Sequence, residues 1–492
     1  MVGGYCCRSM SLADDRNKPF DTAVVDERMA VVLRQLQSMK VDLAQPLEEA
    51  NPQEHMLRSE YNSLQNSKQP ISSLPDEIFA MILGFGREIT IPSNFSINVS
   101  HVASRWRRIA IGTPHLWSEM LDVDTWLEEQ RAAYFNRSAP IPVSLSVYVD
   151  YNAQKIAGIV EAYAGRLGQL LCNLGESDDH EDLLRSLAST DFPVLTHFVI
   201  MGYRCIGWTD IIHIPLLDGK CPALTSIFSE GRLSLFSLRQ MPSLTAVCLS
   251  ITDLLSDYIV QELRNMLTQT SLQHLELDMS MARNRSIIWP SSTTIELPAL
   301  QTLLMWNLLG QNFALQASGF MDGLYAPALR TVLLQGRIYQ HENGHLSALI
   351  AQMSTWPRRF PCLRTLACPT ARGEGGAEWA RRVAQTLPEI THIDNTRKEV
   401  TSALLPDSSF SGVLWPNLHT ISFRTWLVGS HVDKLTQLLL YRKAIGHPIK
   451  TVQVPERDIQ YMADLESLVR IAPLPEHEVV WYGPLGNFMR RD

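Results

Sequence analysis

Residues 270–279 read TSLQHLELDM, and this stretch decides how most of the chain is expected to fold. Its leucines stand at an anchor position (Leu272), three residues later (Leu275) and five residues later (Leu277). The last two share one face of a strand because side chains alternate along a strand with a period of two. The anchor enters the same core at the preceding turn. A strand with one apolar face requires neighbouring strands of the same kind.

The same pattern recurs throughout the chain after residue 190. Most copies begin Pro-x-Leu, as in FPVLTHFVI, LPALQTLLMWN and WPNLHTISF, and successive anchors lie about 28 residues apart, with one short and one long unit. Two earlier stretches, VSLSVYVD and RLGQLLCNLG, read as degenerate copies at the N-terminal edge. The ten anchors are Leu195, Leu224, Leu244, Leu272, Leu300, Leu329, Leu363, Ile390, Leu418 and Ile449.

Between the anchors lie amphipathic stretches with helical spacing, such as residues 253–269 (DLLSDYIVQELRNMLTQ) and 430–445 (SHVDKLTQLLLYRKAI). A proline just before the anchor suits the start of a strand, where its missing N–H does little harm. The alternation predicts an α/β fold, a curved parallel sheet with helices outside it, built from repeats. The alternative is a non-repetitive α/β domain whose strands begin with Pro-x-Leu.

Composition narrows the classes of function. The 492 residues carry a formal charge of −8 and a pI near 6.0, so no basic surface for nucleic acid is expected. No apolar run approaches a membrane span, and no signal peptide opens the chain, which predicts a cytoplasmic or nuclear protein without a membrane partner. Eight cysteines without a C-x-x-C pair are expected to be reduced thiols.

Most common motifs of catalysis and cofactor binding are missing from the sequence. It has no G-x-S-x-G or G-x-x-x-x-G-K-[ST] motif. Residues 341–345 (HENGH) do match H-E-x-x-H, but a match this short does not identify a metal site unless it lies on a helix, and Asn343 and Gly344 disfavour a helix there. We therefore expect no enzyme activity, no cofactor and no bound metal.

Ahead of the repeats, residues 71–83 read ISSLPDEIFAMIL. Ser73 is the expected N-cap of a helix, and Pro75 fits its first turn. Apolar residues follow around more than one stripe of this helix, so one neighbour in a small unit cannot cover them all. A second helix is expected over residues 97–111, ending at GTPHLW.

LPDEIFAMIL followed by VSHVASRWRRIAIGTPHLW resembles an F-box of the fungal F-box-like, leucine-rich-repeat type. The resemblance implies that this unit binds a Skp-type adaptor, which links it to a cullin-RING ubiquitin ligase, and that the leucine-rich repeats bind a target protein. The residues implied in adaptor binding are Leu74, Pro75, Ile78, Phe79, Ile82, Leu83, Val99, Val102, Trp106, Ile109, Pro114, Leu116 and Trp117. Two alternatives stay open: these residues form only a core, or the unit caps a repeat scaffold that has no ligase.

Target binding is expected on the strand face opposite the buried residues, at two, four and six residues after each anchor. An exposed Trp306 beside the acidic Glu276 and Asp278 predicts a contact site for a basic segment, unless a loop or the C-terminal tail covers Trp306. The residues expected to bind the target are Phe228, His274, Glu276, Asp278, Trp306 and Arg424.

These patterns and the resemblance together predict six segments. They are a disordered N-terminus (1–20), a helical segment (21–69), an F-box-like domain (70–120), a connector (121–140), a leucine-rich-repeat domain (141–482) and a C-terminal tail (483–492).

Overall fold

The chain divides into two units, Met1–Trp117 and Ser118–Asp492. The predictions for residues 1–20, for residues 253–269 apart from Leu267, for residues 483–492 and for Arg424 lie outside the described residues. The computed structural model describes residues 22–39, 52–89, 94–149, 152–175, 180–202, 220–229, 241–252, 267, 271–281, 294–309, 319–337, 349–367, 375–394, 398–406, 412–423 and 430–474.

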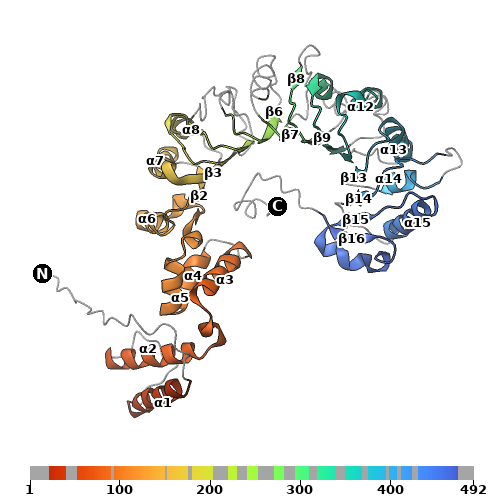
Figure 1. Ribbon diagram of the computed structural model, residues 1–492. Helices are drawn as coiled ribbons and strands as arrows, with labels where there is room; N and C mark the ends of the chain where they lie inside the picture. The colour runs from red at the N-terminus through yellow and green to blue at the C-terminus, as the bar shows by residue number, and fades with distance from the viewer. Residues whose placement is uncertain are drawn as a thin grey trace. The chain divides into compact units, whose positions relative to one another are not determined.

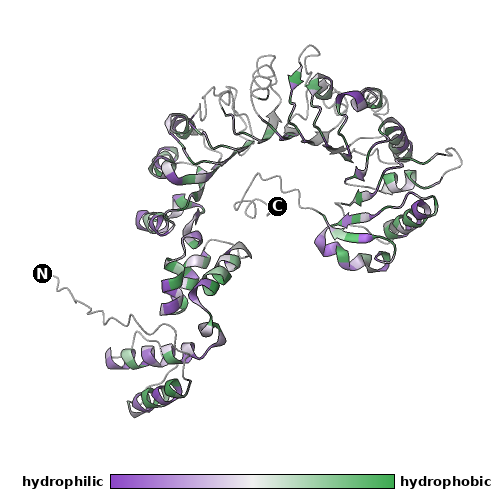
Figure 2. Ribbon diagram, in the orientation of Figure 1, coloured by the Kyte–Doolittle hydropathy of each residue, from purple (hydrophilic) through white to green (hydrophobic). Residues whose placement is uncertain are grey.

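The first unit is helical in its described residues. Its elements are α1 (Thr22–Ser38), α2 (Pro52–Ser67), η2 (Pro70–Ser73), α3 (Asp76–Ile89), α4 (Phe95–Val102), α5 (Ser104–Ile111) and η4 (Pro114–Trp117). Helices α1 and α2 lie side by side (Figure 1). Val32 and Leu36 of α1 are buried, and Arg28 pairs with Glu60 at 2.6 Å. Hydrophobic residues run along α3, whereas α1 and α2 carry both hydrophobic and hydrophilic residues (Figure 2).

The expected single helix over residues 97–111 is wrong, because the structure has two helices there. Ala103 separates α4 from α5 with an extended backbone (φ −156°, ψ 162°). The break gives α5 its own direction, so that Arg105 and Trp106 both reach α3. Ser73 is not an N-cap of α3, since its hydroxyl donates to the Pro70 carbonyl oxygen instead.

The second unit is α/β with a large parallel sheet, as the strand and helix alternation predicts. Within the described residues the sheet has 14 strands in the order β1-β2-β3-β4-β5-β6-β7-β9-β11-β12-β13-β14-β15-β16, all parallel to their neighbours. Strands β8 and β10 form a separate parallel pair. The strands of this unit lie side by side along an arc with helices on its outer side (Figure 1).

The bounds of the strands follow the repeat in the sequence. The strands are β1 (Glu119–Met120), β2 (Val143–Val149), β3 (Leu167–Leu174), β4 (His197–Gly202), β5 (Ser226–Ser229), β6 (Ala246–Thr252), β7 (His274–Met281), β8 (Ile295–Glu296), β9 (Thr302–Leu309), β10 (Leu324–Tyr325), β11 (Thr331–Arg337), β12 (Thr365–Ala367), β13 (His392–Ile393), β14 (Thr420–Ser422), β15 (Thr451–Val454) and β16 (Arg470–Pro473). The helices are α6 (Glu128–Arg137), α7 (Ala153–Tyr163), α8 (His180–Ser189), α12 (Trp356–Arg359), α13 (Gly375–Thr386), α14 (Lys398–Ala403) and α15 (Ser430–Ala444), with 3-10 turns η5 (Val123–Thr125), η6 (Ala164–Arg166) and η10 (Glu456–Leu465).

The register of the sheet repeats with the anchors. The residue two positions after each anchor is the cross-strand neighbour of the equivalent residue in the next copy, so one copy in the sequence corresponds to one strand in the sheet. This row is His197, Ser226, Ala246, His274, Thr302, Thr331, Thr365, His392, Thr420 and Thr451. Residues three and five positions after the anchors, such as Leu275, Leu277 and Leu303, are buried on the opposite face.

Proline in these copies belongs to a turn rather than to the strand itself. In each Pro-x-Leu copy the anchor N–H donates to the carbonyl oxygen three residues earlier, as from Leu195 to Phe192 (3.4 Å) and from Leu418 to Trp415 (3.0 Å). Proline is the second residue of this β-turn, where its fixed φ is favoured. The residue before each proline is buried, so the apolar pattern begins one position earlier than Pro-x-Leu. These residues are Phe192, Cys221, Met241, Leu297, Ala326, Phe360, Leu387 and Trp415.

The segment expected to be a connector, residues 121–140, carries η5 and α6 of the second unit. Just before it, β1 pairs with β2 and so supplies the first strand of the sheet. Arg131 of α6 is buried and donates to the carbonyl oxygen of Val123 at 3.2 Å. The sheet therefore begins ahead of the repeats recognised in the sequence.

Candidate protein-binding sites

Helix α3 has two apolar faces, and one of them forms the core of the first unit. Phe79 and Leu83, four residues apart, are buried, and Gly86 continues the same stripe. A Cβ on Gly86 would lie 2.8 Å from the ring of Phe95, so glycine allows that ring to approach the helix. The Trp106 ring meets the Phe79 ring edge-on at 4.7 Å between centroids.

The other face of α3 is exposed. Ile78, Met81, Ile82 and Phe85 follow the helical spacing of three and four residues, and their exposed fractions are 45%, 57%, 43% and 60%. About half of each side chain meets solvent, which for side chains of about 200 Å² gives an apolar patch of roughly 400 Å². We call these four residues the α3 outer stripe.

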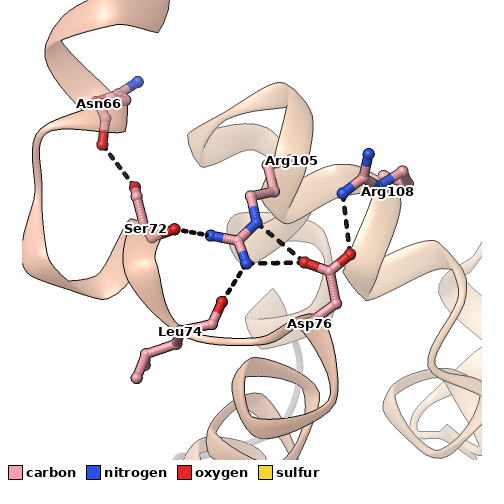
Figure 3. Close-up of polar contacts among 6 residues, drawn as sticks. All are labelled: Asn66, Ser72, Leu74, Asp76, Arg105 and Arg108. Atoms are coloured by element: carbon pink, nitrogen blue, oxygen red, sulfur yellow. Dashed lines mark hydrogen bonds and ion pairs between the residues drawn. The ribbon is translucent and has the colours of Figure 1, made fainter. Parts of the chain in front are cut away.

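The start of α3 is held by a network centred on Arg105 (Figure 3). Its guanidinium donates to Asp76 Oδ1 from Nε (3.0 Å) and Nη2 (2.8 Å), to the Ser72 carbonyl oxygen from Nη1 (2.6 Å), and to the Leu74 carbonyl oxygen. Arg108 donates to Asp76 Oδ2 at 2.9 Å. The hydrogen bond from Arg105 holds the pKa of Asp76 below its usual value. The network fixes the backbone that presents Leu74 and Pro75.

The structure divides the residues predicted to bind an adaptor into three groups. Those that remain exposed are Pro75, Ile78, Ile82 and Val102. Those that are half-buried are Leu74, Trp106 and Pro114. Those that are buried are Phe79, Leu83, Val99, Ile109, Leu116 and Trp117. The buried group forms a core and supports the exposed group, because a partner cannot reach side chains that are already covered.

Within residues 70–117, three exposed large apolar residues were not among the predicted contacts. They are Met81, Phe85 and Ile111. Met81 and Phe85 complete the outer stripe at helical spacing from Ile78, and this spacing is visible in the sequence. What the sequence does not show is which of the two apolar stripes of α3 the rest of the unit covers.

The second unit presents a row of side chains on the face of the sheet opposite the buried leucines. Four residues after each anchor, adjacent strands align Leu171, Val199, Phe228, Cys248, Glu276, Leu304, Leu333 and Ala367. We call the face that carries this row the inner face. Glu276 is the charged residue among these eight, and the same position after the anchor Ile390 is Asp394, a charged residue that is buried.

Two apolar clusters flank Glu276 on the inner face. Phe228 packs against the buried residues of β3, β4 and β6, including Val199 and Cys248. Trp306 packs against Leu304, Leu333 and Ala367, and it is the cross-strand neighbour of Asp278.

The expectation that Trp306 is exposed is wrong, because the Trp306 side chain is half-buried. Its indole Nε1 is shielded from solvent and has no hydrogen-bond acceptor in the part of the chain that is described. His274, Glu276 and Asp278 lie together on β7 and are half-buried as well, so five of the six residues predicted for target binding share the inner face.

Polar side chains continue the inner face toward β16. His392 Nε2 lies 2.6 Å from Ser422 Oγ, which donates to Gln453 Oε1 at 2.6 Å. Ser422 is buried and already shared between two partners, so the contact is a structural link between neighbouring strands. Arg470 of β16 is the cross-strand neighbour of Thr451, so it continues the register row that runs from His197 to Thr451. The Arg470 side chain is exposed.

Burial shifts the pKa of several titratable groups of the second unit. Burial lowers the pKa of His197 and of His274, which keeps both rings neutral. Burial raises the pKa of the Cys172 thiol to about 12, so this cysteine is not a nucleophile at neutral pH. Among the residues with described positions, no group of three His, Cys, Asp or Glu side chains could hold a metal ion.

No family model matches this sequence, and no curated protein matches it. Among the helices that the structure describes, none has both the length and the apolar character needed to cross a membrane.

Proposed function

We propose that this chain is the substrate-recognition subunit of an SCF-type (Skp, cullin, F-box) ubiquitin ligase. In this proposal the first unit is an F-box that binds a Skp-type adaptor through the α3 outer stripe together with Leu74 and Pro75. The second unit is a leucine-rich-repeat domain that binds the target protein on its inner face. The chain itself performs no chemistry.

The observation that supports adaptor binding is the α3 outer stripe. A stripe of Ile, Met, Ile and Phe at helical spacing matches the way one helix binds an apolar groove or helix of a partner. The opposite stripe is already buried and the start of the helix is fixed by Arg105, so the outer stripe is presented on a rigid support.

The second candidate is a repeat scaffold without a ligase, in which the first unit caps the repeats. The observation that disfavours it is that β1 and α6 of the second unit already supply the first strand and helix next to β2. Under the cap proposal, removing residues 70–117 would unfold the second unit. Under the ligase proposal the second unit stays folded and only adaptor binding is lost.

The test is calorimetric titration of the full chain with a purified Skp-type adaptor. Ile78→Asp/Ile82→Asp changes two exposed side chains, so circular dichroism should be unchanged. Each side chain offers about 90 Å² of apolar surface, worth about 2 kcal/mol on burial, and we expect binding to weaken roughly 100-fold or more.

The matched control for this titration is Leu440→Asp/Tyr461→Asp, which alters two exposed apolar residues of the second unit. This control should bind the adaptor as the unmodified chain does. Absence of binding by the unmodified chain, or equal binding by the α3 variant, would reject the proposal.

A further inference from the structure

The inner face carries charged residues of opposite sign that are half-buried or exposed at two places along the sheet, whereas Asp394, which follows β13, is buried. Glu276 and Asp278 lie on β7 between the cluster of Phe228 and the cluster of Trp306. Arg470 lies on β16 and is exposed. A segment that follows this face from β16 to β7 is therefore matched best by acidic residues at its start, apolar residues in its middle and basic residues at its end.

Residues 475–492, PEHEVVWYGPLGNFMRRD, have this order. Glu476 and Glu478 come first. The middle, residues 479–489, is apolar apart from Asn487 and includes one tryptophan, one tyrosine and one phenylalanine. Arg490 and Arg491 follow, next to Asp492. The composition is that of a segment able to pack on the half-buried aromatic side chains of the inner face, Phe228 and Trp306, and to pair with carboxylates at its far end.

The segment is long enough to make these contacts. It follows Leu474, directly after β16. From β16 the sheet order passes β15, β14, β13, β12, β11 and β9 before β7, seven spacings of about 4.8 Å or roughly 34 Å in all. The 16 residues from Leu474 to Arg490 extend up to about 53 Å. Glu476 and Glu478 can lie up to about 14 Å from Leu474, and Arg470 is four residues before Leu474, so both glutamates are within reach of Arg470.

Trp306 gives an independent reason to expect that a segment binds on the inner face. Its Nε1–H is shielded from solvent without an acceptor in the described part of the chain, and a buried indole N–H normally has one. An extended segment crossing β9 brings backbone carbonyl oxygens to this position. An apolar side chain alone would leave the N–H unpaired.

We propose that residues 475–492 of this chain bind its own inner face, with Arg490 and Arg491 opposite Glu276 and Asp278 and the aromatic residues of the segment on the Trp306 cluster. The proposal does not rest on the ligase function. If the inner face also binds a target protein, the target competes with this segment, and a basic target segment is the kind that displaces it.

Zero-length cross-linking of the full chain tests this contact. Arg490→Lys/Arg491→Lys keeps both charges and introduces amines, and a carbodiimide joins an amine to a carboxylate only when the two are in direct contact. We expect an amide link from position 490 or 491 to Glu276 or Asp278, identified by mass spectrometry of the digested protein. A mixture of ¹⁵N-labelled and unlabelled chains shows whether the link lies within one molecule.

A matched control and a charge exchange complete the experiment. Arg457→Lys places an amine on exposed η10 and should give at least tenfold less link to Glu276 or Asp278. Combining Glu276→Lys/Asp278→Lys with Arg490→Glu/Arg491→Glu should restore the link with the partners exchanged. If these inner-face substitutions prevent folding, cross-linking of the Arg490→Lys/Arg491→Lys variant is sufficient by itself to test the proposal.

Two results overturn the proposal. A link found only between labelled and unlabelled chains means that a second copy occupies the face, and no link above the level of the Arg457→Lys control means that the segment does not bind there. Adaptor titration of the same variants should be unchanged in every case, because none of them alters α3. Failure of this inference is therefore distinguishable from failure of the ligase proposal.

Discussion

Replacing Arg105 with methionine is the most informative single change in the first unit. The substitution Arg105→Met keeps an unbranched side chain of similar length but removes every hydrogen bond to Asp76, Ser72 and Leu74 (Figure 3). At the start of α3 two backbone carbonyl oxygens lose this donor, and Asp76 keeps only its contact with Arg108. The helix should then open locally more often.

The expected loss of stability in Arg105→Met depends on how exposed Arg105 and Asp76 are. The side chains of Arg105 and Asp76 are 29% and 45% exposed, so their ion pair is screened and contributes no more than about 1 kcal/mol. The two bonds to carbonyl oxygens add about 0.5 to 1 kcal/mol each. The expected loss is about 2 kcal/mol in the free energy of local opening, which corresponds to roughly 30-fold faster exchange.

Hydrogen exchange of the full chain, followed by mass spectrometry, measures this opening in peptides that cover residues 76–89. The matched control is Arg107→Met, which removes an exposed arginine of the same helix. Exchange in peptides of the second unit should be unchanged in both variants. An increase of less than about threefold in Arg105→Met, or an equal increase in Arg107→Met, would refute the assigned role.

The pH dependence of α3 opening is a second test of the contact between Arg105 and Asp76. The pKa of Asp76 is lowered, first by the hydrogen bond from Arg105. A carboxylate whose pKa is lower in the folded state contributes its full stabilisation above its unfolded pKa, about 3.9, and loses it as pH falls through the folded value. Arg105→Met should therefore flatten the pH dependence of α3 opening below about pH 4.

Three further changes test the supporting structure. Gly86→Ala places a Cβ 2.8 Å from the Phe95 ring and should destabilise α3 by about 1 to 2 kcal/mol, whereas Gly84→Ala meets nothing within 4 Å and should stabilise it by about 0.5 to 1 kcal/mol; equal exchange rates in α3 would contradict this. Buried Arg442 donates to the carbonyl oxygens of four residues, so Arg442→Met should lower the free energy of unfolding in urea by about 3 kcal/mol or more, and a loss below about 1 kcal/mol would exclude that role. Burial lowers the pKa of His197, so its stabilisation is complete above about pH 6.5 and is lost as pH falls through the folded value; His197→Gln should reduce the difference in urea midpoint between pH 7 and pH 5, and an unchanged difference would refute this.

The repeat in the sequence predicts the α/β class and the parallel sheet well because its signal is local. Each anchor and the residue three positions later are apolar, the residue five positions later is apolar in most copies, and the anchors return after nearly the same number of residues. Neighbouring copies therefore align with one another, and the register row from His197 to Thr451 follows. The turn before each strand was only partly recognised, since the buried residue ahead of each proline is read easily as part of the preceding helix.

The candidate sites were less predictable because exposure depends on residues far away in the chain. Six of the thirteen motif residues in the first unit are buried, and the sequence spacing of α3 fits either of its two apolar stripes. Trp306 alternates onto the inner face as predicted, yet packing against β11 and β12 leaves it half-buried. Neither outcome can be derived from a pattern that considers one element at a time.

The sequence by itself determined the periodic part of this protein: strands at regular intervals, an apolar row on one face of each strand and an apolar helix ahead of them. Tertiary structure decided which surfaces remain free. Ala103 breaks the second helix, Trp106 then covers Phe79, and Arg105 fixes the start of α3, so that Ile78 and Ile82 face solvent. The physical reason is that periodicity fixes which side chains share a face, whereas burial is fixed by the side chains that other elements bring against that face.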